Sequence, residues 1–223
     1  MKLEKIQKTL TYNFKQEDLL DQALTHRSYS GGSNNERLEF LGDSVLSLVI
    51  SENIYRREPG ATEGELSRIR ASLVKQEALA QVARDINLGD FIKLGSGELK
   101  SGGYRRSSIL SDTLEAVLGA IYLEAGFEQA RETITVLYRD YLDTLPDGKT
   151  LKDSKTQLQE YLQSRQIDLP EYVVIQTVGK SHDQEFTVAC KVDAIPLQST
   201  GKGLSRKKAE QDAAQKALKL LNL

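Results

Sequence analysis

Hydrophobic residues recur every three or four positions along most of the chain up to about residue 142. This spacing predicts helices, and it is clearest at 37–50, 78–86 and 108–125. Stretches rich in Gly, Ser and Pro, such as "GGSNN" and "EPGATEG", separate these segments and predict loops. The first part of the chain should therefore be almost entirely α-helical.

The pattern changes after "DTLPDGKTLKDS" (143–154), which has the composition of a linker. A helix with Ser154 as its N-cap is expected next, and a long Ala-rich helix is expected at 205–221. Between them, β-branched and partly alternating segments predict three strands, at 171–179, at 185–193 and near 195–201.

These elements predict a multi-domain chain, in which an all-α domain is followed by an α+β domain of the order α-β-β-β-α. We expect the all-α domain to span 1–146, a linker to span 147–152, and the α+β domain to span 153–223.

The composition is that of an ordinary globular protein, since 39% of the 223 residues are hydrophobic and 28% are charged. The single cysteine, Cys190, excludes an intrachain disulfide. The charged N-terminus "MKLEKIQKTL" lacks the apolar core of a signal peptide, and no apolar run approaches the roughly 20 residues that span a bilayer. We therefore expect a cytoplasmic protein without membrane contact.

The net charge of −2 conceals a small asymmetry between the two parts of the chain. Residues 1–150 contain 19 basic and 23 acidic residues, a net of −4, whereas residues 151–223 contain 11 and 9, a net of +2. An acidic part suits a metal site and a basic part suits an anion-binding module.

Acidic residues lie at helical spacing inside two of the most apolar segments. Glu36, Glu39 and Asp43 are at i, i+3 and i+7, and Asp112 and Glu115 are at i and i+3, so each set shares one helix face. Packed together, two such helices would present several carboxylates, which favour Mg²⁺ or Mn²⁺ over Zn²⁺ in the absence of Cys and His. Spacing alone leaves open a simple solvated acidic face.

Basic residues gather in the second part of the chain in "GKGLSRKKAEQ", which contains Lys202, Arg206, Lys207 and Lys208. Their charges, together with backbone N–H groups at the start of a helix, favour phosphate. A merely solvated basic turn remains the alternative for this cluster taken by itself.

The segment "NERLEFLGDSVL" resembles the signature helix of the bacterial ribonuclease III family. The blocks "ALTHRSY", "EGELSRIRASLV" and "LGSGELKSGGYRRSSILSDTLEAVLGAIYL", and then a double-stranded-RNA-binding domain, follow in the family's order. The resemblance implies an endoribonuclease that hydrolyses double-stranded RNA with a divalent metal, leaves 5′-phosphate and 3′-hydroxyl ends with short 3′ overhangs, and processes ribosomal and messenger RNA.

The resemblance also implies the residues of the active centre. Mg²⁺, or Mn²⁺ in its place, is expected to bind Glu39, Asp43, Asp112 and Glu115, and the catalytic set is expected to comprise Asp43, Glu115, Glu36 and Glu63. Glu63 is preferred over the neighbouring Glu65 because it holds the first acidic position of "EGELSR".

No side-chain nucleophile is expected. Hydrolysis by a bound water requires none, Cys190 lies in an apolar strand-like run, and His26 in "LTHRS" is interpreted as a structural hydrogen-bonding residue.

The resemblance implies two partners, double-stranded RNA and a second copy of the chain, and no small-molecule cofactor. The residues expected to contact RNA are Thr156, Gln159, Glu160, His182, Ser205, Arg206, Lys207 and Lys208. Such a module reads A-form shape and 2′-hydroxyls more than base sequence. Phe40 is expected to enter the partner subunit at the dimer interface.

Two other classes fit the sequence less well. A relative that binds RNA without cutting it should have lost carboxylates, yet all five acids of the two helices are present. A di-iron carboxylate oxidoreductase should carry Glu-x-x-His on two helices, and the sequence contains no such motif.

Overall fold

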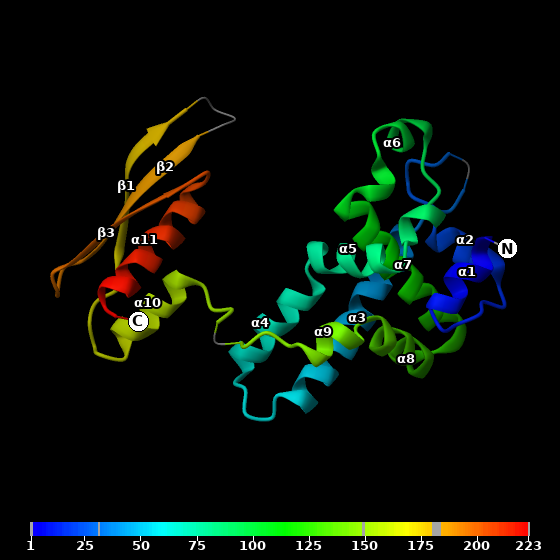
Figure 1. Cartoon of the computed structure of the whole chain (residues 1–223), viewed down its shortest axis with the longest axis horizontal. Helices are drawn as coiled ribbons and strands as arrows, with labels where there is room; N and C mark the ends of the chain where they lie inside the picture. The colour runs from blue at the N-terminus through cyan, green and yellow to red at the C-terminus, as the bar shows by residue number, and fades with distance from the viewer. Residues whose placement is uncertain (1, 31, 149, 180–183, 223) are drawn as a thin grey trace. The chain divides into compact units, whose positions relative to one another are not determined.

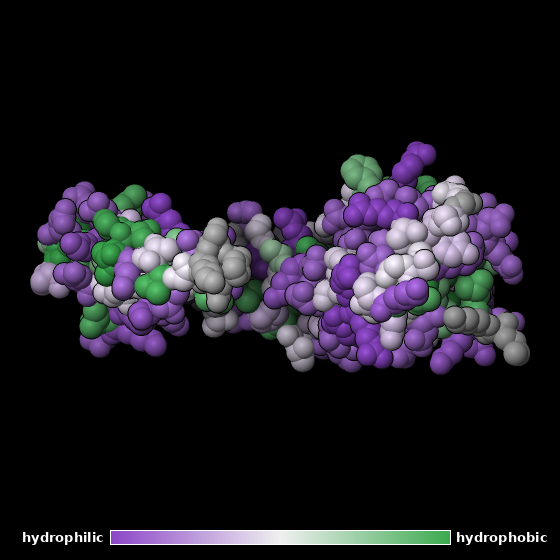
Figure 2. All heavy atoms as spheres, turned by 90° about the horizontal axis from the view of Figure 1, so that it is seen from above, coloured by the Kyte–Doolittle hydropathy of each residue, from purple (hydrophilic) through white to green (hydrophobic). Residues whose placement is uncertain are grey.

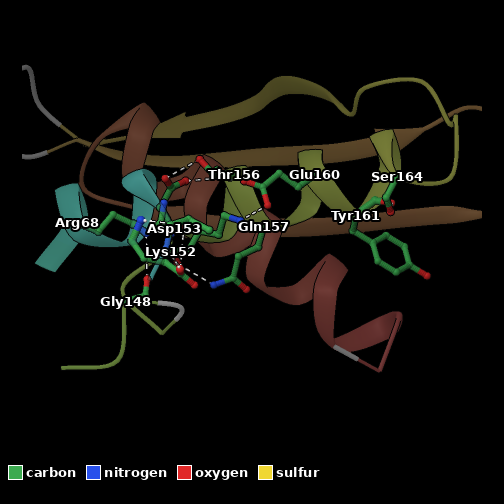
Figure 3. A network of polar contacts seen from close by, with 11 residues as sticks. Arg68, Gly148, Lys152, Asp153, Thr156, Gln157, Glu160, Tyr161 and Ser164 are labelled. Atoms are coloured by element: carbon green, nitrogen blue, oxygen red, sulfur yellow. Dashed lines mark hydrogen bonds and ion pairs between the residues drawn. The ribbon is translucent and has the colours of Figure 1, made fainter. Parts of the chain in front are cut away.

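A computed structural model describes residues 2–30, 32–148, 150–179 and 184–222 of the chain, and it separates into two compact units, Met1–Thr150 and Leu151–Leu223 (Figure 1). The boundary between the two units falls inside the expected linker. Gly148, in the same segment, still belongs to the first unit, where its carbonyl accepts a hydrogen bond from Arg68 Nε at 3.0 Å (Figure 3).

The first unit is built from helices, as the hydrophobic spacing predicts. Two short 3₁₀ segments, Leu88–Phe91 and Gly103–Arg105, lie between its α-helices. The α-helices are α1 (Lys2–Thr9), α2 (Glu17–Ala23), α3 (Glu36–Arg57), α4 (Glu63–Val74), α5 (Gln76–Asp85), α6 (Ser96–Lys100), α7 (Ser107–Ala125), α8 (Phe127–Leu137) and α9 (Arg139–Asp143). The expected all-α character of this part is confirmed.

Helix α7 forms the centre of the first unit and packs against α2, α3, α5 and α8. Its side chains are apolar almost all round, and Leu114, Val117 and Leu118 are completely buried. A helix that is hydrophobic on every side belongs inside a core. The acids Asp112 and Glu115 are therefore carried on an element that the fold holds rigidly.

The backbones of α3 and α7 meet directly at two glycines. A Cβ atom at Gly42 would overlap the carbonyl of Glu115, and one at Gly119 would overlap the carbonyl of Leu38 and lie 3.0 Å from Gly42 N. Only hydrogen fits at either position. Glycine at both positions therefore sets how closely the two acid-bearing helices approach.

The second unit has the expected order of a helix, three strands and a helix. Its elements are α10 (Ser154–Gln163), β1 (Glu171–Val178), β2 (Glu185–Val192), β3 (Leu197–Gly203) and α11 (Arg206–Leu220). The strands form one antiparallel sheet in the order β1-β2-β3, in which Val188 of β2 pairs with Val174 and Gly201. The expected α+β fold is confirmed.

Both helices of the second unit pack on one face of the sheet. The buried core joins Leu158 and Leu162 of α10 to Cys190 of β2 and to Ala213 and Ala217 of α11. The small alanines allow α11 to lie close to the strands. Cys190 is fully buried in this core, in agreement with its exclusion as a nucleophile.

The N-cap of α10 is Asp153, one residue before the expected Ser154. The Asp153 carboxylate accepts hydrogen bonds from Thr156 N at 3.1 Å, Thr156 Oγ1 at 2.8 Å and Gln211 Nε2 at 2.7 Å (Figure 3). Burial opposes ionisation, but the hydrogen bonds from Gln211 and Thr156 outweigh it and hold the pKa of Asp153 below its usual value. The carboxylate thus joins the start of α10 to α11.

Among the described residues, no helix is both long enough and apolar enough to cross a membrane.

We predict that Gly119→Ala lowers the free energy of unfolding by about 1–3 kcal/mol, because the added methyl group must push α3 and α7 apart. Thermal and chemical unfolding followed by circular dichroism measure the change. Gly97→Ala on α6 is the matched control, since nothing lies within 4 Å of its Cβ position. There, alanine should raise the stability by up to about 1 kcal/mol. Equal effects at both positions would contradict the close contact.

We predict that Asp153→Ala loosens the first turn of α10 at neutral pH, because loss of an N-cap costs about 1 kcal/mol. Amide hydrogen exchange in that turn should be about fivefold faster than in the wild type, as 1.4 kcal/mol corresponds to tenfold. The depressed pKa means that this stability is present above the unfolded pKa and is lost as the pH falls through the folded value. The ratio of exchange rates should therefore fall towards one as the pH drops below the folded pKa of Asp153, and exchange that is equally fast in both proteins at pH 7 would refute the cap. Asp168→Ala, an exposed acid of the same unit, should have no effect.

Candidate metal centre and nucleic-acid interface

Three of the predicted ligands come together where α3 packs against α7. Glu39, Asp112 and Glu115 each offer a carboxylate oxygen, and these oxygens lie within 4.8 Å of one another. All three residues are half-buried. The three residues are named the carboxylate cluster below.

Burial and mutual repulsion raise the pKa values of two members of the cluster, Glu115 and Glu39. Burial, followed by repulsion from Asp43, Glu39 and Asp112, raises the pKa of Glu115 from 4.5 to about 8. Burial and repulsion from Asp112, Glu36 and Asp43 likewise raise the pKa of Glu39, and Arg27 opposes this only in part. The acids repel one another in the absence of a cation.

The cluster fits a hard divalent cation on three counts. Every donor atom is a carboxylate oxygen, which is the ligand that Mg²⁺ and Mn²⁺ prefer. Opposite ligands of Mg²⁺ lie roughly 4.2 Å apart, which is twice the metal–oxygen distance of about 2.1 Å, so oxygens within 4.8 Å need only small side-chain adjustments. A cation would also relieve the repulsion.

The fourth predicted ligand, Asp43, is exposed and lies outside the group of three. It still acts on the cluster, since its charge repels Glu115 more strongly than that of Glu39 or Asp112. Asp43 lies on α3 one turn after Glu39 and directly after Gly42, the residue at which α3 contacts α7. The structure therefore places Asp43 beside the cluster without bringing its oxygens to the same distances.

The remaining predicted acids occupy different places. Glu36, the first residue of α3, accepts hydrogen bonds from Asn34 Nδ2 at 2.9 Å and Arg27 Nη1 at 3.5 Å. Glu63, the first residue of α4, accepts a hydrogen bond from Ser67 Oγ at 2.8 Å and lines a different cavity. Within this chain, Glu36 lies at the edge of the site, whereas Glu63 is not brought to it.

The competitor of Glu63 has a structural role. Glu65 accepts hydrogen bonds from Thr62 N at 2.7 Å and Thr62 Oγ1 at 2.8 Å, while Glu65 N donates to Thr62 Oγ1. This capping box begins α4.

A cavity of about 680 Å³ opens beside the cluster. Glu39 and Asp112 form part of its wall, and so do residues that sequence reasoning missed, namely Arg27, Asn35, Glu98 and Arg106. The sequence offers one sign of the two arginines: each directly precedes a serine, in "THRS" and "YRRS", shortly before an acid-bearing helix. His26 also lines the cavity, but its Nδ1 is held in a local turn by Ser28, whose backbone N–H donates to it at 3.2 Å.

The predicted RNA-contacting residues of α10 lie on one face of that helix. Gln159 and Glu160 are exposed, and Thr156 is half-buried. Glu160 forms an ion pair with Lys152, and Thr156 is tied to the Asp153 cap (Figure 3). His182 lies outside the described residues.

At the start of α11, Arg206, Lys207 and Lys208 are exposed. Ser205 is the N-cap of this helix and accepts a hydrogen bond from Lys208 N at 3.2 Å. Arg206 Nε donates to Glu210 at 2.8 Å. Cations and helix N–H groups therefore lie together, as an anion site requires.

Phe40 is 79% exposed although it lies next to the half-buried Glu39 on α3. Leu48 and Tyr55 of the same helix are 57% and 71% exposed. Figure 2 shows hydrophobic residues, in green, at the surface of both units among hydrophilic ones, in purple. Large exposed apolar side chains on one helix are typical of an interaction surface.

Comparison with known proteins gives a consistent result over the whole chain. The family model described as Ribonuclease-III-like matches residues 16–141, and the one described as double-stranded RNA binding motif matches 154–221. Relatives named Ribonuclease 3 include one from Glaesserella parasuis, 53% identical over 100% of both chains, and one from Vibrio cholerae, 52% identical over 98% of this chain and 97% of the relative.

A solved structure of the nuclease domain of ribonuclease III from Campylobacter jejuni resembles the first unit. The two are 47% identical in sequence, and the match covers 62% of this chain and 98% of the solved chain with a TM-score of 0.60.

We predict that Glu115→Gln raises the melting temperature of the protein in EDTA, because an uncharged group replaces the most strongly perturbed carboxyl. The raised pKa makes Glu115 increasingly destabilising as the pH rises from 4.5 to about 8. The difference between the two proteins should therefore vanish near pH 4.5 and be largest above pH 8, at about 2–4 °C for each kcal/mol of repulsion relieved.

Two comparisons complete this test. Mg²⁺ should stabilise the wild type more than Glu115→Gln, and Glu17→Gln at the exposed start of α2 should raise the melting temperature at no pH. A Glu115→Gln protein that melts below the wild type at pH 8 would mean that the cluster is not under repulsion.

Proposed function

Because the chain belongs to the ribonuclease III family, we propose that it is an endoribonuclease that hydrolyses the phosphodiester bonds of double-stranded RNA with a divalent cation. The observation that carries the proposal is the meeting of Glu39, Asp112 and Glu115 at the contact of α3 and α7. The match of the second unit to the double-stranded RNA binding motif supports the choice of substrate.

The four acids Glu39, Asp43, Asp112 and Glu115 would hold the cation, which we propose to be Mg²⁺, with Mn²⁺ as a substitute. When bound, the cation lowers the pKa of a coordinated water and neutralises charge on the phosphate. Asp43 and Glu115 form the proposed essential pair, and Glu36, at the edge of the site, is proposed to help align the metal or the substrate. Glu63 retains its proposed supporting role, although it lies away from the cluster within one chain.

The second unit would hold the duplex by its shape and its phosphates. Thr156, Gln159 and Glu160 are proposed to face one minor groove and His182 the next. Ser205, Arg206, Lys207 and Lys208, at the start of α11, are proposed to contact phosphates between the two grooves. The proposed domain limits are 1–146 and 153–223, with 147–152 as the linker.

Two copies of the chain would each cut one strand, leaving short 3′ overhangs with 5′-phosphate and 3′-hydroxyl ends. The nuclease domain of ribonuclease III from Campylobacter jejuni is described as structurally flexible in a region involved in dimer formation. The exposed Phe40, beside the ligand Glu39, supports a dimer interface that adjoins the active centre. Precursors of ribosomal and messenger RNA are the proposed natural substrates, and the cytoplasm is the proposed location.

The deciding experiment is incubation with a long RNA duplex in Mg²⁺ or in EDTA, followed by analysis of the product ends. We expect short duplexes with 5′-phosphates in Mg²⁺, no cleavage in EDTA, and no cleavage of the single strands. Glu115→Gln should bind the duplex and cut it orders of magnitude more slowly. A wild-type protein that binds duplex but never cuts it would support an RNA-binding relative without catalysis.

We predict that Phe40→Ala weakens the dimer by about 30-fold or more, because truncating a buried aromatic anchor costs at least about 2 kcal/mol. Sedimentation over a range of protein concentrations measures the dissociation constant. Leu204→Ala removes another exposed apolar side chain, 68% exposed, from the second unit and should leave the dimer unchanged. An unaltered Phe40→Ala dimer at nanomolar concentration would rule out this interface.

A further inference from the structure

The cavity beside the carboxylate cluster contains two arginines that the proposed chemistry does not use. Arg27 comes from the loop after α2, and Arg106 comes from the loop before α7. Both line the same cavity as Glu39 and Asp112. Fixed positive charge therefore adjoins the acidic site.

Each arginine is held at the cavity by a carboxylate that is not part of the cluster. Arg27 Nη1 lies 3.5 Å from Glu36 Oε1, and Arg106 Nη1 lies 3.0 Å from Glu98 Oε2. The arginine side chains remain 72% and 49% exposed. Exposed pairs of this kind bind weakly, so the guanidinium groups are oriented and can still exchange a carboxylate for another anion.

Asn35 adds an independent sign that a ligand belongs in this cavity. It lines the cavity, is only 2% exposed, and its side-chain Nδ2 has no hydrogen-bond partner in the part of the chain that the structure describes. Its backbone N–H donates to the Thr25 carbonyl at 2.9 Å, which holds the residue in place. Buried donors are almost always paired in folded proteins. The Asn35 side chain can therefore donate a hydrogen bond to an acceptor atom from outside the chain.

We infer that Arg27, Arg106 and Asn35 form a subsite for a backbone phosphate of the RNA strand, next to the phosphodiester that is hydrolysed. Guanidinium groups bind phosphate oxygens through paired N–H donors, and a buried amide adds a third donor. The inference rests on the proposed function and adds a specific role to it. The subsite fixes the strand so that the reacting phosphodiester lies over the carboxylate cluster, and Glu36 and Glu98 are positioning residues for the arginines.

The test compares Arg27→Gln and Arg106→Gln with the wild type in the full-length protein, using a long RNA duplex. Binding is measured in EDTA over a range of salt concentrations, and cleavage is measured in Mg²⁺. Each variant should flatten the slope of log affinity against log salt by somewhat less than one unit. Each should also lower kcat/KM by about 10- to 100-fold, the loss expected for a charge-assisted hydrogen bond.

Matched variants separate phosphate binding from a structural role. Arg131→Gln on α8 breaks a similar ion pair, with Glu128, and should change neither slope nor rate. Arg27→Lys and Arg106→Lys should keep the slope and recover only part of the rate, because lysine lacks the planar fork. Asn35→Leu should lower kcat/KM by about tenfold and leave the melting temperature unchanged or higher. If Asn35 were instead needed only for the fold, the same substitution would lower the melting temperature.

The outcomes for the subsite and for the proposed function can be told apart. If the wild type cleaves and both glutamine variants keep its slope and its kcat/KM, the subsite is wrong and the function stands. A change in slope without a change in rate, or the reverse, also overturns the subsite, since the arginines must both hold a phosphate and position the reacting one. If the wild type fails to cleave, the proposed function fails, and the slopes in EDTA still decide whether the arginines bind phosphate.

Discussion

The direct contact between the backbones of α3 and α7 is the constraint on which the candidate active centre depends. Gly42 lies between Glu39 and Asp43, and the carbonyl that its hydrogen faces belongs to Glu115. The contact that brings the two helices close together therefore also brings the carboxylates together. Any side chain at the crossing would separate the helices and, with them, the acids.

This arrangement is costly for the protein without its cation. Burial disfavours the charged form of these carboxylates and they repel one another, so the pKa values of Glu39 and Glu115 are both raised. The apolar surroundings of α7 supply the stability that offsets it, because Leu114, Val117 and Leu118 are fully buried on the same helix. The burial of apolar side chains on α7 thus stabilises the fold against the repulsion between the acids that the same helix carries.

Local patterns predict the elements well, since helical spacing and β-branched runs depend on neighbours in sequence. The α-β-β-β-α order and the face shared by Glu39 and Asp43 follow from spacing alone. The crossing glycines and the cavity arginines could not be found in this way, because each depends on a segment far away in sequence. Arg27 and Arg106, for example, are 79 residues apart. The N-cap at Asp153 was missed by one residue because Asp and Ser are equally good caps.

The glycine crossing also limits how such a chain can vary in length. A single residue inserted between Glu39 and Gly42 would rotate the carboxylate by about 100° relative to the glycine. The same holds between Glu115 and Gly119 on the other helix. An insertion or deletion within either helix would therefore disrupt both the crossing and the site, although more than 60 residues separate Asp43 from Asp112. A chimera that exchanges only one of them with a distant homologue would combine acids and glycines that had not been selected to meet.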